Sequence, residues 1–366
     1  MGVPKLRFKA DDGSDFPDWT YRTFGSVVEE FNDRTTTENE DVLLSCAIDG
    51  MYLNSELFGH QRGASNIGYK KITKGALILS MQNLHLGNAN VNTRFEHGIV
   101  SPAYKTFHIV GCLTEFMSAW VKRHAARIFF YDATTVGASQ CRRNVDWEEL
   151  YQQTIAVPSP LEQRKIADLL SAVDDVIAAQ EAEVAAWEKR KKGVMQKLFR
   201  QEVRFKADDG SDFPDWEEKT LGDICMYERQ RSEGANFIGT ENMLKDFGGV
   251  AFDNSKADGS GTLYHPGDTL MSNIRPYLKK AWLADRKGTC STDVLVFHPT
   301  SVEPGYLYWL IASDAFVRYV MSAAKGSKMP RGDKKHIMEM PLLLPNKDEQ
   351  RKIDDCLSSL NDVIIK

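Results

Sequence analysis

The sequence predicts an α+β protein built twice on one plan, with two similar mixed α/β domains, each containing a twisted sheet, joined by long helices in a pseudo-two-fold repeat. Two repeated segments, and the difference between the long segments that separate them, predict this fold. The thirteen residues Arg7–Trp19 recur letter for letter as Arg204–Trp216. The motif Glu162–Ile166 returns as Glu349–Ile353. The long segments between these repeats differ from each other, so one duplicated scaffold presents two different surfaces.

The repeats divide the chain into four parts. Residues 1–157 are predicted to form the first domain, residues 158–200 a central helix, residues 201–345 the second domain and residues 346–366 a short C-terminal helix. Each domain contains one copy of the duplicated segment, whose Asp, Gly, Ser and Pro residues predict a loop anchored by its Phe and Trp. Both bodies then alternate short apolar runs with turn residues, which is typical of strands. Gly305–Val320 is too long and too apolar for one strand and predicts helix.

The segment from residue 161 to residue 200 predicts one long helix with a heptad seam. Eight of ten seam positions, spaced 4, 3, 4, 3, are apolar, and the ten are Ile166, Leu170, Val173, Ile177, Gln180, Val184, Trp187, Lys191, Val194 and Leu198. A seam of this length calls for a coiled-coil partner, although a long helix lying on its own domain is the alternative. The second copy starts the same seam but is short. We therefore expect other chains to cover part of the first seam, with candidate interface residues Ile177, Val184, Trp187 and Val194.

Composition limits the possible functions. The net charge of −5 lacks the basic excess of a protein that grips DNA alone, so any nucleic-acid contact must be local or shared with a partner. No apolar run is long enough to span a bilayer, and the N-terminus has no signal-peptide core, so we expect a cytoplasmic protein without membrane contact. The six cysteines are scattered, which predicts free thiols and no metal site. Walker, H-E-x-x-H and methyltransferase motifs are absent, so we predict no catalytic residue.

Two segments of the second domain carry DNA-binding chemistry. Lys325–Lys335 holds five basic residues together with glycine and proline, and Ser272–Lys280 directly follows a predicted strand. Arginine can pair with guanine, asparagine with adenine, and lysine with phosphate. A solvated basic loop is the alternative interpretation. The candidate DNA-binding residues here are Asn273, Arg275, Tyr277, Lys279, Ser327, Lys328, Arg331 and Lys334.

The first domain has candidate loops at matching places. Gly137–Asn144 precedes Glu162 by nearly the same distance as Gly326 precedes Glu349, and Ser80–His85 follows the corresponding strand. Different side chains at equivalent positions are what two different base sequences require. The candidate DNA-binding residues of this domain are Gln82, Asn83, Ser139, Gln140, Arg142 and Arg143.

Together these features resemble the specificity subunits of type I restriction–modification systems, over essentially the whole chain. The segments that carry the resemblance are Leu161–Leu170, Asp348–Ile353, Gly326–Arg331, Ala156–Pro158 and Leu343–Pro345. The resemblance implies two target recognition domains, each reading one half of a bipartite, asymmetric DNA site. It also implies that two conserved helices pack as an antiparallel coiled coil and set the spacer between the halves. The short second helix departs from that pattern.

The resemblance also implies the partners. The expected partners are double-stranded DNA, two methyltransferase subunits, and the restriction and translocase subunits that complete the complex. A second copy of this chain is a further candidate partner. S-adenosylmethionine, ATP and Mg²⁺ are expected on the partner subunits, which leaves this chain without a cofactor. Methyltransferase subunits that clamp the DNA explain how an acidic chain can serve as its reader. The alternative function is a two-surface adaptor or scaffold without DNA specificity, which the basic loops disfavour.

Overall fold

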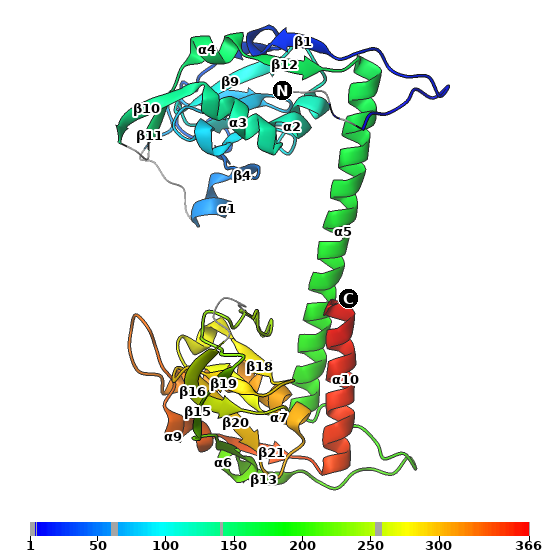
Figure 1. The fold of residues 1–366 in the computed structure, drawn as a ribbon, viewed down its shortest axis with the longest axis vertical. Coiled ribbons are helices and arrows are strands. Elements are labelled where there is room, and N and C mark those ends of the chain that lie inside the picture. The colour runs from blue at the N-terminus through cyan, green and yellow to red at the C-terminus, as the bar shows by residue number, and fades with distance from the viewer. Residues whose placement is uncertain (1–3, 5, 60–64, 140–141, 253–257, 366) are drawn as a thin grey trace. The chain divides into compact units, whose positions relative to one another are not determined.

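The same four-stranded antiparallel sheet occurs twice in the computed structural model of the protein (Figure 1). Its strand order is β2-β9-β6-β7 in the first unit, Met1–Ala179, and β14-β20-β17-β18 in the second unit, Gln180–Lys366. The structure describes residues 4, 6–59, 65–139, 142–252 and 258–365. The predicted duplicated α+β fold is therefore confirmed.

Apolar runs form the strands of the first unit. Leu77, Ile78 and Leu79 of β6 are all fully buried, since β6 lies between β9 and β7, and such a continuous apolar run is typical of an interior strand. Two-stranded ladders β1-β12, β3-β4, β5-β8 and β10-β11 complete the unit. The strands are β1 (Thr20–Thr23), β2 (Val28–Phe31), β3 (Leu44–Cys46), β4 (Met51–Leu53), β5 (Lys70–Thr73), β6 (Leu77–Ser80), β7 (Ala89–Val91), β8 (His97–Val100), β9 (Tyr104–Ile109), β10 (Thr134–Ser139), β11 (Arg142–Val145) and β12 (Thr154–Val157).

Aromatic side chains from the helices fill the core of the first unit. Phe24 packs against Trp120, Phe129 and Phe130, with ring centroids 5.7 to 6.3 Å away. The pairs with Phe129 and Phe130 are edge-to-face and the pair with Trp120 is stacked, and both arrangements add to the stabilisation by apolar burial. The helices are α1 (Asn54–Phe58), α2 (Thr114–Val121), α3 (His124–Asp132), α4 (Trp147–Gln152) and the short 3₁₀ helices η1 (Phe24–Ser26) and η2 (Leu84–Leu86).

The second unit repeats the four-stranded sheet, one two-stranded ladder and the pair of helices that follows the sheet, and differs in its smaller sheets. Its two-stranded ladder β13-β21 corresponds to β1-β12, and β15-β16-β19 forms a further three-stranded sheet. The strands are β13 (Glu217–Thr220), β14 (Cys225–Tyr227), β15 (Arg231–Ala235), β16 (Asp258–Tyr264), β17 (Thr269–Ser272), β18 (Ala281–Leu283), β19 (Gly288–Cys290), β20 (Val294–Pro299) and β21 (Pro341–Leu344). The helices are α6 (Leu221–Ile224), η4 (Pro276–Leu278), α7 (Pro304–Ile311), α8 (Asp314–Ser322), α9 (Lys334–Met338) and α10 (Lys347–Ile365).

The apolar stretch Gly305–Val320 is not one helix. It divides into α7 and α8 at Ser313, whose hydroxyl accepts a hydrogen bond from the backbone N–H of Phe316 at 3.0 Å. A serine that caps the second helix in this way ends the first one, because its own backbone is extended. The first unit has the same break between α2 and α3.

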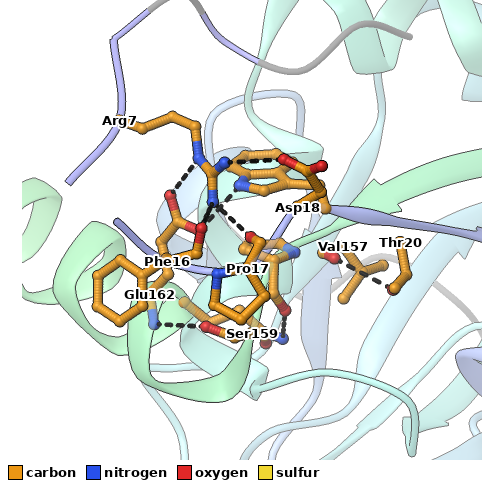
Figure 2. Close-up of polar contacts among 11 residues, drawn as sticks. Arg7, Phe16, Pro17, Asp18, Thr20, Val157, Ser159 and Glu162 are labelled. Carbon is orange, nitrogen blue, oxygen red and sulfur yellow. Dashed lines mark hydrogen bonds and ion pairs between the residues drawn. The ribbon is translucent and has the colours of Figure 1, made fainter. Parts of the chain in front are cut away.

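The duplicated segment and the duplicated Glu-Gln-Arg-Lys motif contact each other. In the first unit Arg7 donates from Nε and Nη2 to the two carboxylate oxygens of Glu162, at 3.0 and 2.7 Å (Figure 2). The indole N–H of Trp19 donates to the same carboxylate at 3.0 Å, and the Glu162 side chain has no exposed surface. A buried carboxylate requires such partners. The arm Arg7–Trp19 is thereby clamped to the first turn of the long helix α5 (Pro160–Phe199).

The second unit repeats this clamp. Arg204 donates to Glu349 at 3.1 and 2.8 Å, and Trp216 donates at 2.9 Å, while Glu349 also has no exposed side-chain surface. The hydrogen bonds to Glu349 raise the pKa of Arg204. The sequence motif therefore recurs because each domain needs the same anchor for its arm.

Within the second unit, the end of α5 pairs with α10 in the opposite direction (Figure 1). Lys191 donates to the side chain of Asn361 at 2.9 Å, and Val194 and Leu198 pack in the same core cluster as Ile353 and Leu357. Val194, a predicted subunit-contact residue, is thus largely covered inside the chain. This antiparallel pairing is what the heptad seam and the predicted fold call for.

The middle part of the seam is bare, whereas Ile166 at its start packs against the core of the first unit. Ile177 and Val184 are 50% and 39% exposed, and every residue from 168 to 186 is exposed in this chain. Trp187 is half-buried, with the guanidinium of Arg190 5.2 Å from its ring centroid.

No helix among the described residues has both the length and the apolarity needed to cross a bilayer.

Candidate nucleic-acid interface

The turn after β17 is the first predicted DNA-binding segment of the second unit. Arg275 and Lys279 both have positive φ angles, 51° and 54°, on either side of η4. Such left-handed backbone is costly for a residue with a side chain and is concentrated at functional sites. Tyr277 lies at the exposed side of this turn and is 48% exposed. Backbone strain of this kind persists only where the surrounding contacts hold the turn in place.

The predicted loop between α8 and α9 is a tight hairpin. Lys325 and Arg331 exchange two backbone hydrogen bonds of 2.9 Å each, and Gly326 has a φ of 99° that favours glycine. Ser327, Lys328 and Met329 at its tip are exposed. The hairpin thus presents its tip to solvent.

The two segments lie against each other. The backbone N–H of Arg275 donates to the carbonyl of Pro330 at 2.8 Å, and Ile274 pairs with Arg331 in an antiparallel bridge. They are separated by more than forty residues of chain, so the fold makes one surface of two segments that the sequence presents separately. We call this surface, residues 273–279 and 325–331, the joined loops.

Ion pairs orient several basic side chains of the joined loops. A terminal nitrogen of Arg331 lies 3.1 Å from the carboxylate of Asp293, and Lys279 lies 2.9 Å from Asp314. Lys325 pairs at 2.9 Å with Asp333, which also accepts from the first backbone N–H groups of α9. The hydrogen bond from Lys325, together with these backbone donors, lowers the pKa of Asp333 to about 2.

The side chains of the turn differ in accessibility. Lys328 is exposed and forms no ion pair with any other described residue. Asn273 is only 7% exposed and does not present its amide to solvent. The Oδ1 atom of Asn273 and the Nε atom of Arg275 are buried without a hydrogen-bond partner in the described part of the chain. Unsatisfied buried groups are rare in folded proteins and call for an explanation.

A basic groove of about 660 Å³ is also present on the second unit. It is lined by Val294–Val296 of β20 and by basic residues of two segments, which are Arg229 and Arg231 between β14 and the start of β15, and Lys334 and Lys335 at the start of α9. Glu228 is the acidic residue in the lining. Sequence reasoning found Lys334 but missed the two arginines, which lie about one hundred residues earlier. Their local signal was two arginines separated by one residue, in the sequence Arg229-Gln230-Arg231.

The first unit has a different surface at equivalent places. Gln82 and Asn83 are exposed in the turn after β6. The next helix, η2, contains His85, whose pKa is lowered by burial and, to a smaller extent, by Arg143 and Arg127. The fold therefore brings the predicted Arg143 near the turn that follows β6.

The predicted basic loop Gly137–Asn144 is wrong as a loop, because most of it belongs to the hairpin β10-β11, which lies between α3 and α4. The β-branched residues next to it, Thr134–Val136, favour pairing with β11. Ser139 and Arg142 are opposite each other in the backbone register, and Gln140 falls outside the described residues. Arg143 donates to the hydroxyl of Thr134 at 2.7 Å and lies over the ring of Tyr131.

The same helix start carries opposite charge in the two units. Asp146 caps α4 and Asp333 caps α9 through their side chains, which places these two residues in register. Trp147-Glu148-Glu149 follow the first cap, and Lys334-Lys335-His336 follow the second. The scaffold is shared, and the groups that it presents are not.

Known proteins match both the sequence and this fold. Residues 214–366 match the family described as the Type I restriction modification DNA specificity domain. The specificity subunit of the type I restriction enzyme EcoDI of Escherichia coli is 27% identical over 25% of this chain and 20% of its own length. That of the enzyme MjaVIII of Methanocaldococcus jannaschii is 22% identical over 58% of this chain and 56% of its own length. The chain thus spans about half or less of these relatives.

Solved structures share the fold of the whole chain. A chain from a study of complex assembly and conformational transition of the type I restriction–modification system has a TM-score of 0.56 and 17% identity, over 95% of this chain and 91% of its own length. The S subunit of such a system from M. genitalium has a TM-score of 0.55 and 13% identity, over 99% and 93%. The fold of the chain is thus that of such subunits, and residues 214–366 carry the matched DNA specificity domain. The chain as a whole is similar to the specificity subunits of type I restriction–modification systems, and residues 214–366 match the model of their DNA specificity domain.

Proposed function

We propose that this chain is the sequence-specific DNA-recognition subunit of a type I restriction–modification system. Each unit reads one half of a bipartite, asymmetric site and directs methyltransferase and restriction subunits to it. The observation that carries the proposal is the junction of the joined loops, where the N–H of Arg275 donates to the carbonyl of Pro330 at 2.8 Å. This contact turns two basic segments into one rigid surface, which base readout requires.

The chemistry of the second unit fits a division of labour. Arg331 is held by Asp293 at 3.1 Å, so its guanidinium is oriented for a directional contact with a base edge. Lys328 is exposed at the hairpin tip and suits a phosphate, for which orientation matters less. The arginines and lysines of the basic groove suit the phosphates that flank the reading site.

The first unit reads the other half-site with a different set. Gln82, Asn83 and Arg143 lie on elements equivalent to those of the joined loops, and Glu148 and Glu149 stand where the second unit has Lys335 and His336. Different groups on one scaffold support two different half-sites.

Catalysis belongs to the partners in this proposal. Methyltransferase subunits supply S-adenosylmethionine, and restriction subunits use ATP and Mg²⁺, while this chain contributes no catalytic residue and no cofactor. With a net charge of −5, the chain shares the grip on the phosphates with those subunits. The assembly works in the cytoplasm, where its DNA lies.

The experiment is a selection from random double-stranded DNA with the purified chain in complex with its methyltransferase subunits. The expected result is enrichment of two short motifs at one fixed separation. A complex that assembles but enriches no sequence would identify the chain as an adaptor without DNA specificity.

A further inference from the structure

The basic groove of the second unit has an equivalent place in the first unit, which the strand register identifies. The same series of cross-strand partners occurs in both units, and it is Arg231, Thr262 and Cys290 in the second and Arg34, Lys70 and Val100 in the first. In the four-stranded sheets, the pairing of β20 with β17 and of β9 with β6 equates Leu295 with Lys105. Thr262 and Leu295 line the basic groove, so Lys70 and Lys105 stand at the equivalent place of the first unit.

The cations at this place come from different elements in the two units. In the second unit the start of α9 contributes two lysines to the basic groove. The equivalent helix of the first unit, α4, begins with Trp147 and Glu148. The first unit instead carries lysines on its strands, Lys70 on β5 and Lys105 on β9.

Lys70 is a buried cation without a partner. Only 4% of it is exposed, and its ammonium forms no hydrogen bond or ion pair with any other described residue. Burial is the main cause that lowers the pKa of Lys70, against the nearby charge of Glu30. Arg34 and Lys105 lower this pKa further, so three cations share the place. A buried charge is costly unless an opposite charge or hydrogen-bond acceptors meet it.

The one acid among the charges that act on Lys70 is already engaged. A carboxylate oxygen of Glu30 lies 2.7 Å from the ammonium of Lys105 and accepts from the hydroxyl of Tyr151 at 3.1 Å. Arg34 and Lys70 therefore have no carboxylate of their own within the described part of the chain. The excess positive charge calls for an anion from outside the chain.

The ammonium of Lys70 is open to such a ligand. In the described part of the first unit, the fully enclosed side-chain atoms that lack a partner belong to Asn88 and Asn90, and not to Lys70. The stem of Lys70 is thus covered while its charge reaches the surface. A lysine held in this way loses little side-chain freedom when it binds an anion.

We propose that Lys70, with Arg34 beside it, binds a phosphate of the DNA backbone next to the half-site that the first unit reads. The inference rests on the proposed function and adds to it a contact that Gln82, Asn83 and Arg143 do not include. A backbone phosphate fits the equivalence with the basic groove, because DNA presents the same phosphates to both units whatever the base sequence. The scaffold keeps the place of the phosphate contact and changes the element that supplies the cation.

The test compares Lys70→Met with Lys71→Met, each in complex with the methyltransferase subunits. Lys71→Met is the matched control, because it removes the same charge from the next residue of β5, whose side chain points to the opposite face and pairs with Glu40. Over a salt series on cognate DNA, Lys70→Met should lower the salt slope by about one unit, and Lys71→Met should leave it unchanged. The enriched sequence should stay the same, because a phosphate contact carries no sequence information.

Two further measurements separate this role from a structural one. Lys70→Met replaces an unpaired buried ammonium with an apolar side chain, so the melting temperature should stay the same or rise. A melting temperature that falls together with the slope would give Lys70 a structural role and overturn the proposal. Glu30→Gln removes the competing acid and frees Lys105, so it should strengthen DNA binding and steepen the salt slope by up to about one unit.

Three DNA-binding results overturn the proposal: a parent-like salt slope of Lys70→Met in a complex that binds DNA, equal changes in Lys70→Met and Lys71→Met, or weaker binding of Glu30→Gln. A changed enriched sequence also overturns it, because Lys70 would then contact a base. Saturable binding of inorganic phosphate to the chain that Lys70→Met abolishes, with an unchanged salt slope on DNA, would assign the site to a free anion instead. A parent complex that binds no DNA would refute the proposed function, and this inference with it.

Discussion

Glu349 and Arg204 form a bidentate ion pair in which Nε and Nη2 of the arginine lie 3.1 and 2.8 Å from the two carboxylate oxygens. Glu162 and Arg7 form the same pair in the first unit, at 3.0 and 2.7 Å. The partners of each pair are 145 and 155 residues apart in sequence. Each unit thus contains one copy of both repeated motifs, and the two motifs contact each other through this ion pair.

The clamp should matter for stability. Glu349→Ala leaves the guanidinium of Arg204 and the indole of Trp216 without their shared acceptor, so we expect the free energy of unfolding to fall by about 3 kcal/mol. Glu349→Gln should cost less, because its amide oxygen still accepts one hydrogen bond. Urea unfolding followed by tryptophan fluorescence measures both. Superimposable unfolding curves for Glu349→Ala and the parent would show that the pair does not stabilise the unit.

The long helix could be predicted from the sequence, whereas the contact of Arg7 and Trp19 with Glu162 could not. The seam from Ile166 to Leu198 is a local, periodic signal, and the helix is found at Pro160–Phe199. The burial of Glu162 depends on residues far away in the chain, and a Glu in a charged motif otherwise suggests solvent. The repeat located the partners, but pairing them required the fold.

The candidate DNA surface shows the same limit. The two basic segments of the second unit were predicted from their composition and their place after a strand and a helix. Their junction, Arg275 to Pro330, and the contribution of Arg229 and Arg231 depend on tertiary pairing. In the first unit, glycine and polar residues at 137–144 suggested a loop, whereas cross-strand pairing makes most of it a hairpin.

Arg331 and Lys328 should have different effects on DNA binding. If the oriented guanidinium of Arg331 contacts a base edge as proposed, Arg331→Ala should weaken cognate binding by about 1–3 kcal/mol and relax preference at one base pair. Lys328→Ala should weaken all sequences alike and lower the salt slope by about one unit. Titrations of cognate and scrambled DNA over a salt series measure both effects. If both variants bind DNA as the parent does, the hairpin is only solvated surface and does not contact DNA.

The basic groove should contribute without specificity. Arg229→Ala combined with Arg231→Ala removes two phosphate contacts, so we expect the salt slope to fall by about two units with the enriched sequence unchanged. Arg286→Ala is a suitable control, since Arg286 is exposed but does not line the groove. The measurement is the same salt series with the methyltransferase complex. A changed sequence preference would instead assign these arginines to base readout.

The bare seam of α5 should be required for assembly. Ile177→Glu places a charge where the side chain is 50% exposed in the lone chain, so the melting temperature should be nearly unchanged. In the complex the same charge would be buried, and affinity for the methyltransferase subunits should fall at least about tenfold. Gel filtration and calorimetric titration with those subunits measure this effect. Full assembly of Ile177→Glu would show that the seam stays solvent-exposed in the complex.

The central claim is that the two units read separate halves of one DNA site, and exchange of one body tests it most directly. The measurement is a map of methylated adenines in cells that carry the methyltransferase subunits and either this chain or a chimaera. In the chimaera, residues 20–157 are replaced by the body of a relative, while both clamps are kept. The proposal predicts that one half of the site changes and that the other half and its spacing persist. A chimaera that folds and assembles but changes both halves, or neither, would contradict it.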